Sequence, residues 1–165
     1  MGADELSATL WRERRQLDFL LFLLETQLLH LRAGSWHRLN ITAAELEKVL
    51  EKLRFESLAR SVEASSAAAE WKAPDKSTLP ALMEIAPSGV WAELLDEHLQ
   101  AMITLLSSID AAAKDNISAL LRGPTANAAD ADDLSVLAPQ ANIQRALDAV
   151  KGTSLRSLRD FLGLN

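Results

Sequence analysis

The stretch that decides the fold is LDFLLFLLETQLLHL, residues 17–31, in which six apolar residues follow one another from Phe19 to Leu24. Leucines recur in and just before it at spacings of 7, 4, 3, 4 and 3, a heptad seam that lets helices lie side by side. The seam is formed by Leu10, Leu17, Leu21, Leu24, Leu28 and Leu31. Other large apolar residues lie off the seam, so we expect either two neighbouring helices, or one helix and a bound partner, to cover this helix.

The apolar run is too short to predict a membrane span. About 20 mostly apolar residues are needed to cross a bilayer, and here Asp18 and Glu25 bracket only six. Acidic and basic residues precede the run and no small-residue cleavage site follows it, so no signal peptide is expected. The absence of cysteine suits a reducing compartment, and we predict a cytoplasmic protein.

Composition favours an all-α fold. Hydrophobic residues make up 48% of the 165, but only 5% are aromatic, and no alternating run is flanked by a hairpin turn. We predict a first long helix over 7–32 that ends at Gly34 in the left-handed conformation. A second helix follows and continues through the small residues of 65–70, where a neighbouring helix is expected to approach closely.

A linker over 72–78 separates these helices from a short helix over 79–86, with Pro80 in its first turn. A third long helix is predicted over 89–122 and is stopped by Gly123-Pro124. Residues 1–123 are therefore expected to form an elongated antiparallel helical hairpin or three-helix bundle.

Residues 124–165 differ in composition and predict a flexible tail, with a mobile linker and two short amphipathic helices. We expect the tail either to fold back on the bundle, to stay disordered, or to order on binding a partner. The apolar residues of the two short helices are candidate partner-binding residues. They are Ile143, Leu147, Val150, Leu155, Leu158, Phe161 and Leu162.

No residue pattern predicts an active site, a cofactor or a metal. The three histidines, His30, His37 and His98, are all at least seven residues apart, whereas a helical zinc protease needs two histidines four apart; they are expected at the surface or at the bundle edge. No nucleophile elbow and no glycine-rich phosphate loop occurs. A net charge of −6 disfavours nucleic-acid binding, which depends on basic side chains.

The four tryptophans lie near expected helix ends or turns, at Trp11, Trp36, Trp71 and Trp91. They are expected to plug the ends of the helical hairpins. The alternative is that some of them line a docking surface, where tryptophan is enriched.

The order of these elements resembles the FlgN family of flagellar export chaperones over about residues 5 to 122. The resemblance rests on an opening Leu-Trp-x-Glu-Arg, on a glycine turn and a second helix with charged pairs, and on an Ala-Pro-x-x-x-Trp break before the third helix. In the first two helices and the turn, the matching positions are Leu10, Trp11, Glu13, Arg14, Gly34, Ala44, Glu45, Leu46, Glu47, Leu50, Leu53, Arg54, Glu56 and Arg60.

The resemblance implies a non-enzymatic cytoplasmic chaperone without a cofactor. Its clients would be hook–filament junction proteins (FlgK/FlgL-like), whose C-terminal amphipathic segment it would hold until delivery to the flagellar export gate. Two alternatives stay open from the sequence. One is a secreted helical hairpin of a specialised secretion system, although the order Gly34-Ser35-Trp36 reverses the Trp-x-Gly turn of that class. The other is a helical signalling or dimerisation module.

Overall fold

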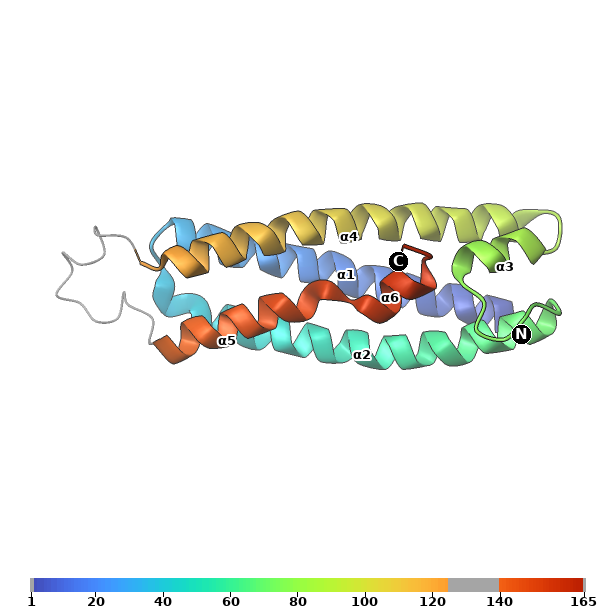
Figure 1. Ribbon diagram of the computed structural model, residues 1–165, viewed down its shortest axis with the longest axis horizontal. Coiled ribbons are helices and arrows are strands. Elements are labelled where there is room, and N and C mark those ends of the chain that lie inside the picture. The colour runs from blue at the N-terminus through green and yellow to red at the C-terminus, as the bar shows by residue number, and fades with distance from the viewer. Residues whose placement is uncertain (1, 125–139, 165) are drawn as a thin grey trace. The chain divides into compact units, whose positions relative to one another are not determined.

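The computed structural model describes residues 2–124 and 140–164, and every regular element within these ranges is helical (Figure 1). This confirms the all-α prediction and the presence of two short helices in the tail. Most of the predicted mobile linker falls at 125–139, outside the described residues. The α-helices are α1 (Gly2–Arg32), α2 (Leu39–Glu70), α3 (Leu79–Ile85), α4 (Val90–Arg122), α5 (Gln140–Lys151) and α6 (Arg156–Phe161), with short 3-10 turns at η1 (Trp36–Arg38) and η4 (Gly152–Ser154).

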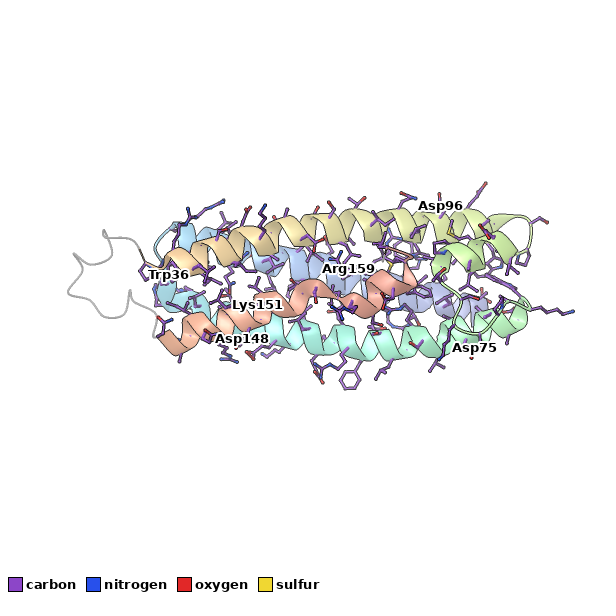
Figure 2. All side chains as sticks on the ribbon, in the orientation of Figure 1. Trp36, Asp75, Asp96, Asp148, Lys151 and Arg159 are labelled. Carbon is purple, nitrogen blue, oxygen red and sulfur yellow. The ribbon has the colours of Figure 1, made fainter. Side chains whose placement is uncertain are left out.

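The helix ends follow the chemistry of the sequence. Gly34 has φ +80°, and the amides of Gly34 and Ser35 donate to the carbonyls of Leu31 and His30 at 3.2 and 2.8 Å. These two bonds form a Schellman motif and confirm the predicted left-handed cap. Trp36 is buried in the turn that follows (Figure 2). At α3, the Thr78 hydroxyl caps the helix by accepting a hydrogen bond from the Ala81 amide.

The chain forms two compact units, and both contain parts of α1, α2 and α4. The described part of unit 1 comprises residues 2–18, 52–106 and 155–164, so it includes α3 and α6. The described part of unit 2 comprises residues 19–51, 107–124 and 140–154, so it includes α5 and both 3-10 turns.

In unit 1, α2 runs antiparallel to α1, and the two helices meet closely at the start of α1. A Cβ atom placed on Gly2 would lie 2.6 to 2.8 Å from Ser66 and Ala67, which is too close for any side chain. This confirms the expected close approach at the small residues of α2. The apolar core of unit 1 is formed by Ala3, Leu6, Leu10, Leu17, Leu53, Ala64, Ala67, Ala68, Leu79, Leu82, Leu95, Leu99, Met102, Leu106, Leu158 and Leu162.

In unit 2, α1, α2, α4 and α5 all contribute buried apolar side chains, and a buried polar network links α1, α2 and α4. The Thr42 hydroxyl donates to Gln27 Oε1 at 2.7 Å, and Gln27 Nε2 donates to Asn116 Oδ1 at 2.9 Å. Asn116 Nδ2 in turn donates to the carbonyls of Leu24 and Ala112 at 2.9 and 2.8 Å. Because a buried polar group without a partner is costly, this network favours one register of α1, α2 and α4.

The seam leucines of α1 are buried, except for Leu21, which is half-buried. Off the seam the outcome is mixed. Leu20 and Leu23 are buried, whereas Phe19 and Phe22 are exposed and stack on each other with ring centroids 6.1 Å apart. Neighbouring helices therefore cover one off-seam flank of α1 and leave the other open.

Candidate partner-binding groove

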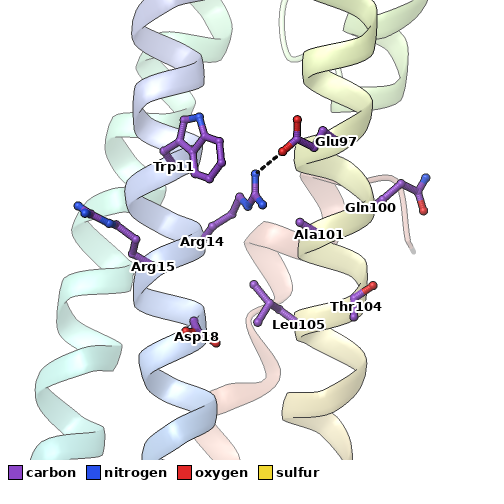
Figure 3. Close-up of a pocket in the computed structure, with 9 residues that line it drawn as sticks. All are labelled: Trp11, Arg14, Arg15, Asp18, Glu97, Gln100, Ala101, Thr104 and Leu105. Carbon is purple, nitrogen blue, oxygen red and sulfur yellow. Dashed lines mark ion pairs between the residues drawn. The ribbon is translucent and has the colours of Figure 1, made fainter.

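An open groove of about 640 Å³ lies between α1 and α4 in unit 1 (Figure 3). Both helices supply residues spaced three or four apart, so that each presents one continuous side to the groove. The lining residues are Trp11, Arg14, Arg15, Asp18, Glu97, Gln100, Ala101, Thr104 and Leu105.

The groove combines an apolar floor with charged rims. Ala101 is small and half-buried, and Leu105 lies one turn further along α4. Trp11 forms part of the α1 wall and is 44% exposed. The other three tryptophans fit the expectation that they pack at helix ends. Trp36 is buried in its turn, and Trp71 and Trp91 meet edge to face at 5.8 Å.

Behind the groove, a buried histidine holds Arg14 in place. Arg14 Nη1 lies 3.2 Å from His98 Nδ1, and the Arg14 guanidinium stacks on the Trp11 ring at 4.1 Å. His98 Nε2 lies 3.1 Å from the Ser7 hydroxyl. His98 is fully buried, so the expectation that it lies at the surface or bundle edge is wrong: His98 falls on the apolar side of α4 that faces α1.

The hydrogen bonds fix the tautomer of His98. Arginine only donates, so Nδ1 must accept, and Nε2 must carry the proton and donate to the Ser7 oxygen. Burial, together with the charge of Arg14, lowers the pKa of His98 to about 4, so the ring is neutral at pH 7. A general base would need an unprotonated nitrogen facing the serine hydroxyl, and this ring presents N–H there. The cluster therefore positions Arg14 and does not activate Ser7.

A second buried contact joins α1 to α2 and α6 in unit 1. Glu13 and Arg60 form an ion pair in which both side chains are only 2% exposed. Arg60 also donates to Ser157 Oγ of α6 at 3.0 Å and lies 5.2 Å from the Phe161 ring. Burial raises the pKa of Glu13 to about 7 despite the opposing charge of Arg60.

The opening motif of the family resemblance and Arg60 of the second-helix motif come together in unit 1. Leu10 is buried in the core, Trp11 and Arg14 line the groove, and Glu13 pairs with Arg60. The sequence did not predict the participation of His98 in this cluster, because His98 is 84 residues from Arg14 and belongs to no motif.

The predicted partner-binding residues of the tail are largely packed inside the two units. Ile143, Leu147 and Val150 of α5 are buried in unit 2. In unit 1, Leu158 and Leu162 are buried, whereas Leu155 and Phe161 are half-buried. A partner would contact most of these side chains only after displacing α5 or α6, so their role in binding stays a prediction.

A third apolar feature is an exposed stripe on α2 in unit 1. Phe55, Leu58 and Val62 share one face of the helix and are all more than 60% exposed. This stripe is a convex surface formed by one helix, whereas the groove is concave and flanked by two helices. An incoming helix gains more contact in a groove of this kind, because its side-chain ridges fit between the flanking helices.

Among residues 2–124 and 140–164, no group of three or more histidine, aspartate or glutamate side chains is placed to hold a metal ion. No helix in the same ranges has the length and apolar character needed to cross a membrane. Comparisons of the chain with protein-family models, with curated proteins and with solved structures gave no match.

Proposed function

We propose that this chain is a flagellar export chaperone that holds the C-terminal amphipathic segment of a hook–filament junction protein. The client segment binds as a helix in the groove between α1 and α4, and the chaperone delivers it to the export gate. The observation that carries this proposal is a concave groove whose wall includes a partly exposed tryptophan, Trp11, stacked against an arginine. Tryptophan and arginine are the residues most enriched at energetic centres of protein interfaces.

The chemistry of such a client fits the groove. A segment that assembles later through an amphipathic helix exposes an apolar ridge beforehand, and that ridge promotes premature association. In the groove, the ridge packs over Ala101 and against Leu105 and Trp11, while the charged rims face the polar sides of the client helix. The client pays the entropy of ordering when it binds, which moderates the affinity and favours release.

The family resemblance supplies the identity of the client, and the placement of its residues supports the proposal. The opening motif provides Trp11 and Arg14 to the groove, and Glu13 of the same motif pairs with Arg60 of the second-helix motif. The opening motif and the end of the second-helix motif therefore lie in unit 1, whereas Gly34 and the start of the second-helix motif, from Ala44 to Leu50, lie in unit 2.

The test is to co-express the full chain with the C-terminal segment of each junction protein from the same genome, and to measure affinities by calorimetry. Ala101→Trp fills the floor of the groove, and Leu58→Ser removes apolar surface from the α2 stripe as a matched control. We expect a stoichiometric complex with the wild type and with Leu58→Ser. Burying one large apolar side chain is worth about 1.5 to 3 kcal/mol, so Ala101→Trp should weaken binding more than tenfold.

Two outcomes contradict this proposal. If neither junction segment co-purifies with the wild type, the client assignment is wrong. If Leu58→Ser abolishes binding while Ala101→Trp leaves it unchanged, the groove is the wrong site. Far-UV circular dichroism of each variant establishes that the helices are intact.

A further inference from the structure

Arg14 is held rigidly at the edge of the groove before any partner arrives. Its guanidinium lies 4.1 Å from the centre of the Trp11 ring, and Nη1 lies 3.2 Å from the buried Nδ1 of His98. The Arg14 side chain is only 17% exposed. A flexible surface arginine loses rotamer freedom when it binds a ligand, whereas Arg14 has already lost most of it in the folded protein.

Most of the hydrogen-bonding capacity of Arg14 remains unused. Its contacts to His98 and to Glu97 are both made by Nη1, so the Nε and Nη2 donors have no acceptor among the residues that the structure describes. The Glu97 carboxylate lies 4.0 Å away, beyond hydrogen-bond distance, and its side chain is 60% exposed. Figure 3 shows Arg14 reaching across from α1 toward Glu97 on α4.

The surroundings compensate the positive charge of Arg14 only weakly. His98 accepts a hydrogen bond from Arg14 as a neutral ring and supplies no negative charge. The carboxylate of Glu97 forms only a long ion pair with Arg14, at 4.0 Å, and is 60% exposed, and Asp18 lines the groove without an ion pair among the described residues. A part-buried guanidinium with a free pair of parallel donors is the arrangement that recognises a carboxylate in bidentate fashion.

We propose that Arg14 is the receptor for an acidic side chain on the helix that binds the groove, and that Glu97 competes with this side chain for Arg14. The inference rests on the proposed function, since it names what the bound helix must carry. The partner is an amphipathic helix with a Glu or Asp one turn away from a large apolar residue that seats over Ala101. On binding, the partner carboxylate takes the Nε and Nη2 donors, and Glu97 turns out into solvent.

The test measures calorimetric affinities of the full-length protein for two synthetic amphipathic peptides. Both peptides carry the same leucine seam, and they differ only in having Glu or Gln on each turn beside it. The protein is used as wild type, as Arg14→Gln and as Glu97→Gln. Arg12→Gln is the matched control, because Arg12 lies on the same helix and pairs with Glu56 of α2. Far-UV circular dichroism checks that each variant keeps its helices.

We expect Arg14→Gln to weaken binding of the Glu peptide at least tenfold and to change binding of the Gln peptide less than twofold. Glu97→Gln should tighten binding of the Glu peptide severalfold, because the competing carboxylate is gone, and Arg12→Gln should change neither affinity. Equal effects of Arg14→Gln on the two peptides, or no measurable binding of either peptide to the wild type, would overturn the inference.

The junction-protein segments separate this inference from the proposed function. If a segment binds the wild type and Arg14→Gln equally well, the role of Arg14 in binding a partner carboxylate is wrong and the proposed chaperone function stands. If no junction segment binds while the Glu peptide shows the expected dependence on Arg14, the groove chemistry stands and the client assignment is wrong.

Discussion

The buried ion pair between Glu13 and Arg60 predicts an unusual dependence of stability on pH. Burial raises the pKa of Glu13 from 4.5 to about 7, the nearby carboxylate of Glu56 adds to this rise, and the charge of Arg60 opposes both effects. One oxygen of Glu13, Oε2, is buried and has no hydrogen-bond partner among the described residues. A negative charge on this carboxyl group is therefore poorly stabilised, which is consistent with the raised pKa. Between pH 4.5 and 7 the folded protein therefore binds more protons at Glu13 than the unfolded chain does.

The free energy of unfolding should consequently decrease as the pH rises through this window. The difference between a pKa of 4.5 and one of about 7 corresponds to at most about 3 kcal/mol. A glutamine side chain cannot ionise and has nearly the shape of the protonated acid. The Glu13→Gln variant should therefore exceed the wild type by less than about 1 kcal/mol at pH 5 and by up to about 3 kcal/mol at pH 8.

The assay is urea denaturation followed by far-UV circular dichroism at pH 5, 6, 7 and 8, for the wild type and for Glu13→Gln. Glu45→Gln is the control, because Glu45 forms an exposed pair with Lys48 that contributes little at any pH. If Glu13→Gln is instead less stable than the wild type by more than about 1 kcal/mol at pH 8, the attraction of Arg60 outweighs the burial of the carboxylate and the reasoning is wrong.

Two further predictions concern the packing of unit 2. Asn116→Ala removes the α4 member of the polar network and leaves Gln27 Nε2 without its acceptor. We expect urea denaturation to show that the free energy of unfolding falls by about 2 to 3 kcal/mol. A decrease below about 0.5 kcal/mol would mean that the network does not hold the helices in register. Leu147→Ala removes a buried side chain of α5 and should lower the free energy of unfolding by about 2 to 4 kcal/mol in the same assay. If α5 is detached from the unit in solution, the free energy of unfolding will hardly change.

The helices could be predicted from sequence because their signals are local. The leucine seam, the left-handed cap at Gly34 and the stop at Gly123 each depend on neighbouring residues, and all three agree with the structure. The start of α1 was predicted at residue 7 but lies at Gly2. Its first turn packs closely against Ser66 and Ala67 at Gly2, and no local pattern reveals this contact between distant parts of the chain.

The candidate site could be predicted only in part. The sequence left open that some of the four tryptophans line a docking surface but did not single out Trp11, and the resemblance includes Arg14 among its matching positions. The arrangement of Trp11 and Arg14 depends on His98, which meets them only because α4 packs beside α1. Likewise, the sequence showed that α1 is apolar on more than one face, but not which flank would stay open. That depends on helices that are distant along the chain, and it leaves Phe19 and Phe22 exposed.

The central claim is that a client helix occupies the groove between α1 and α4, and site-specific photo-crosslinking tests it most directly. A photoreactive side chain is placed at Thr104 in the groove, or at Leu58 on the α2 stripe, in the full-length protein bound to a junction-protein segment. We predict a covalent adduct with the segment from position 104 and little or none from position 58. An adduct from position 58 with none from position 104 would contradict the account.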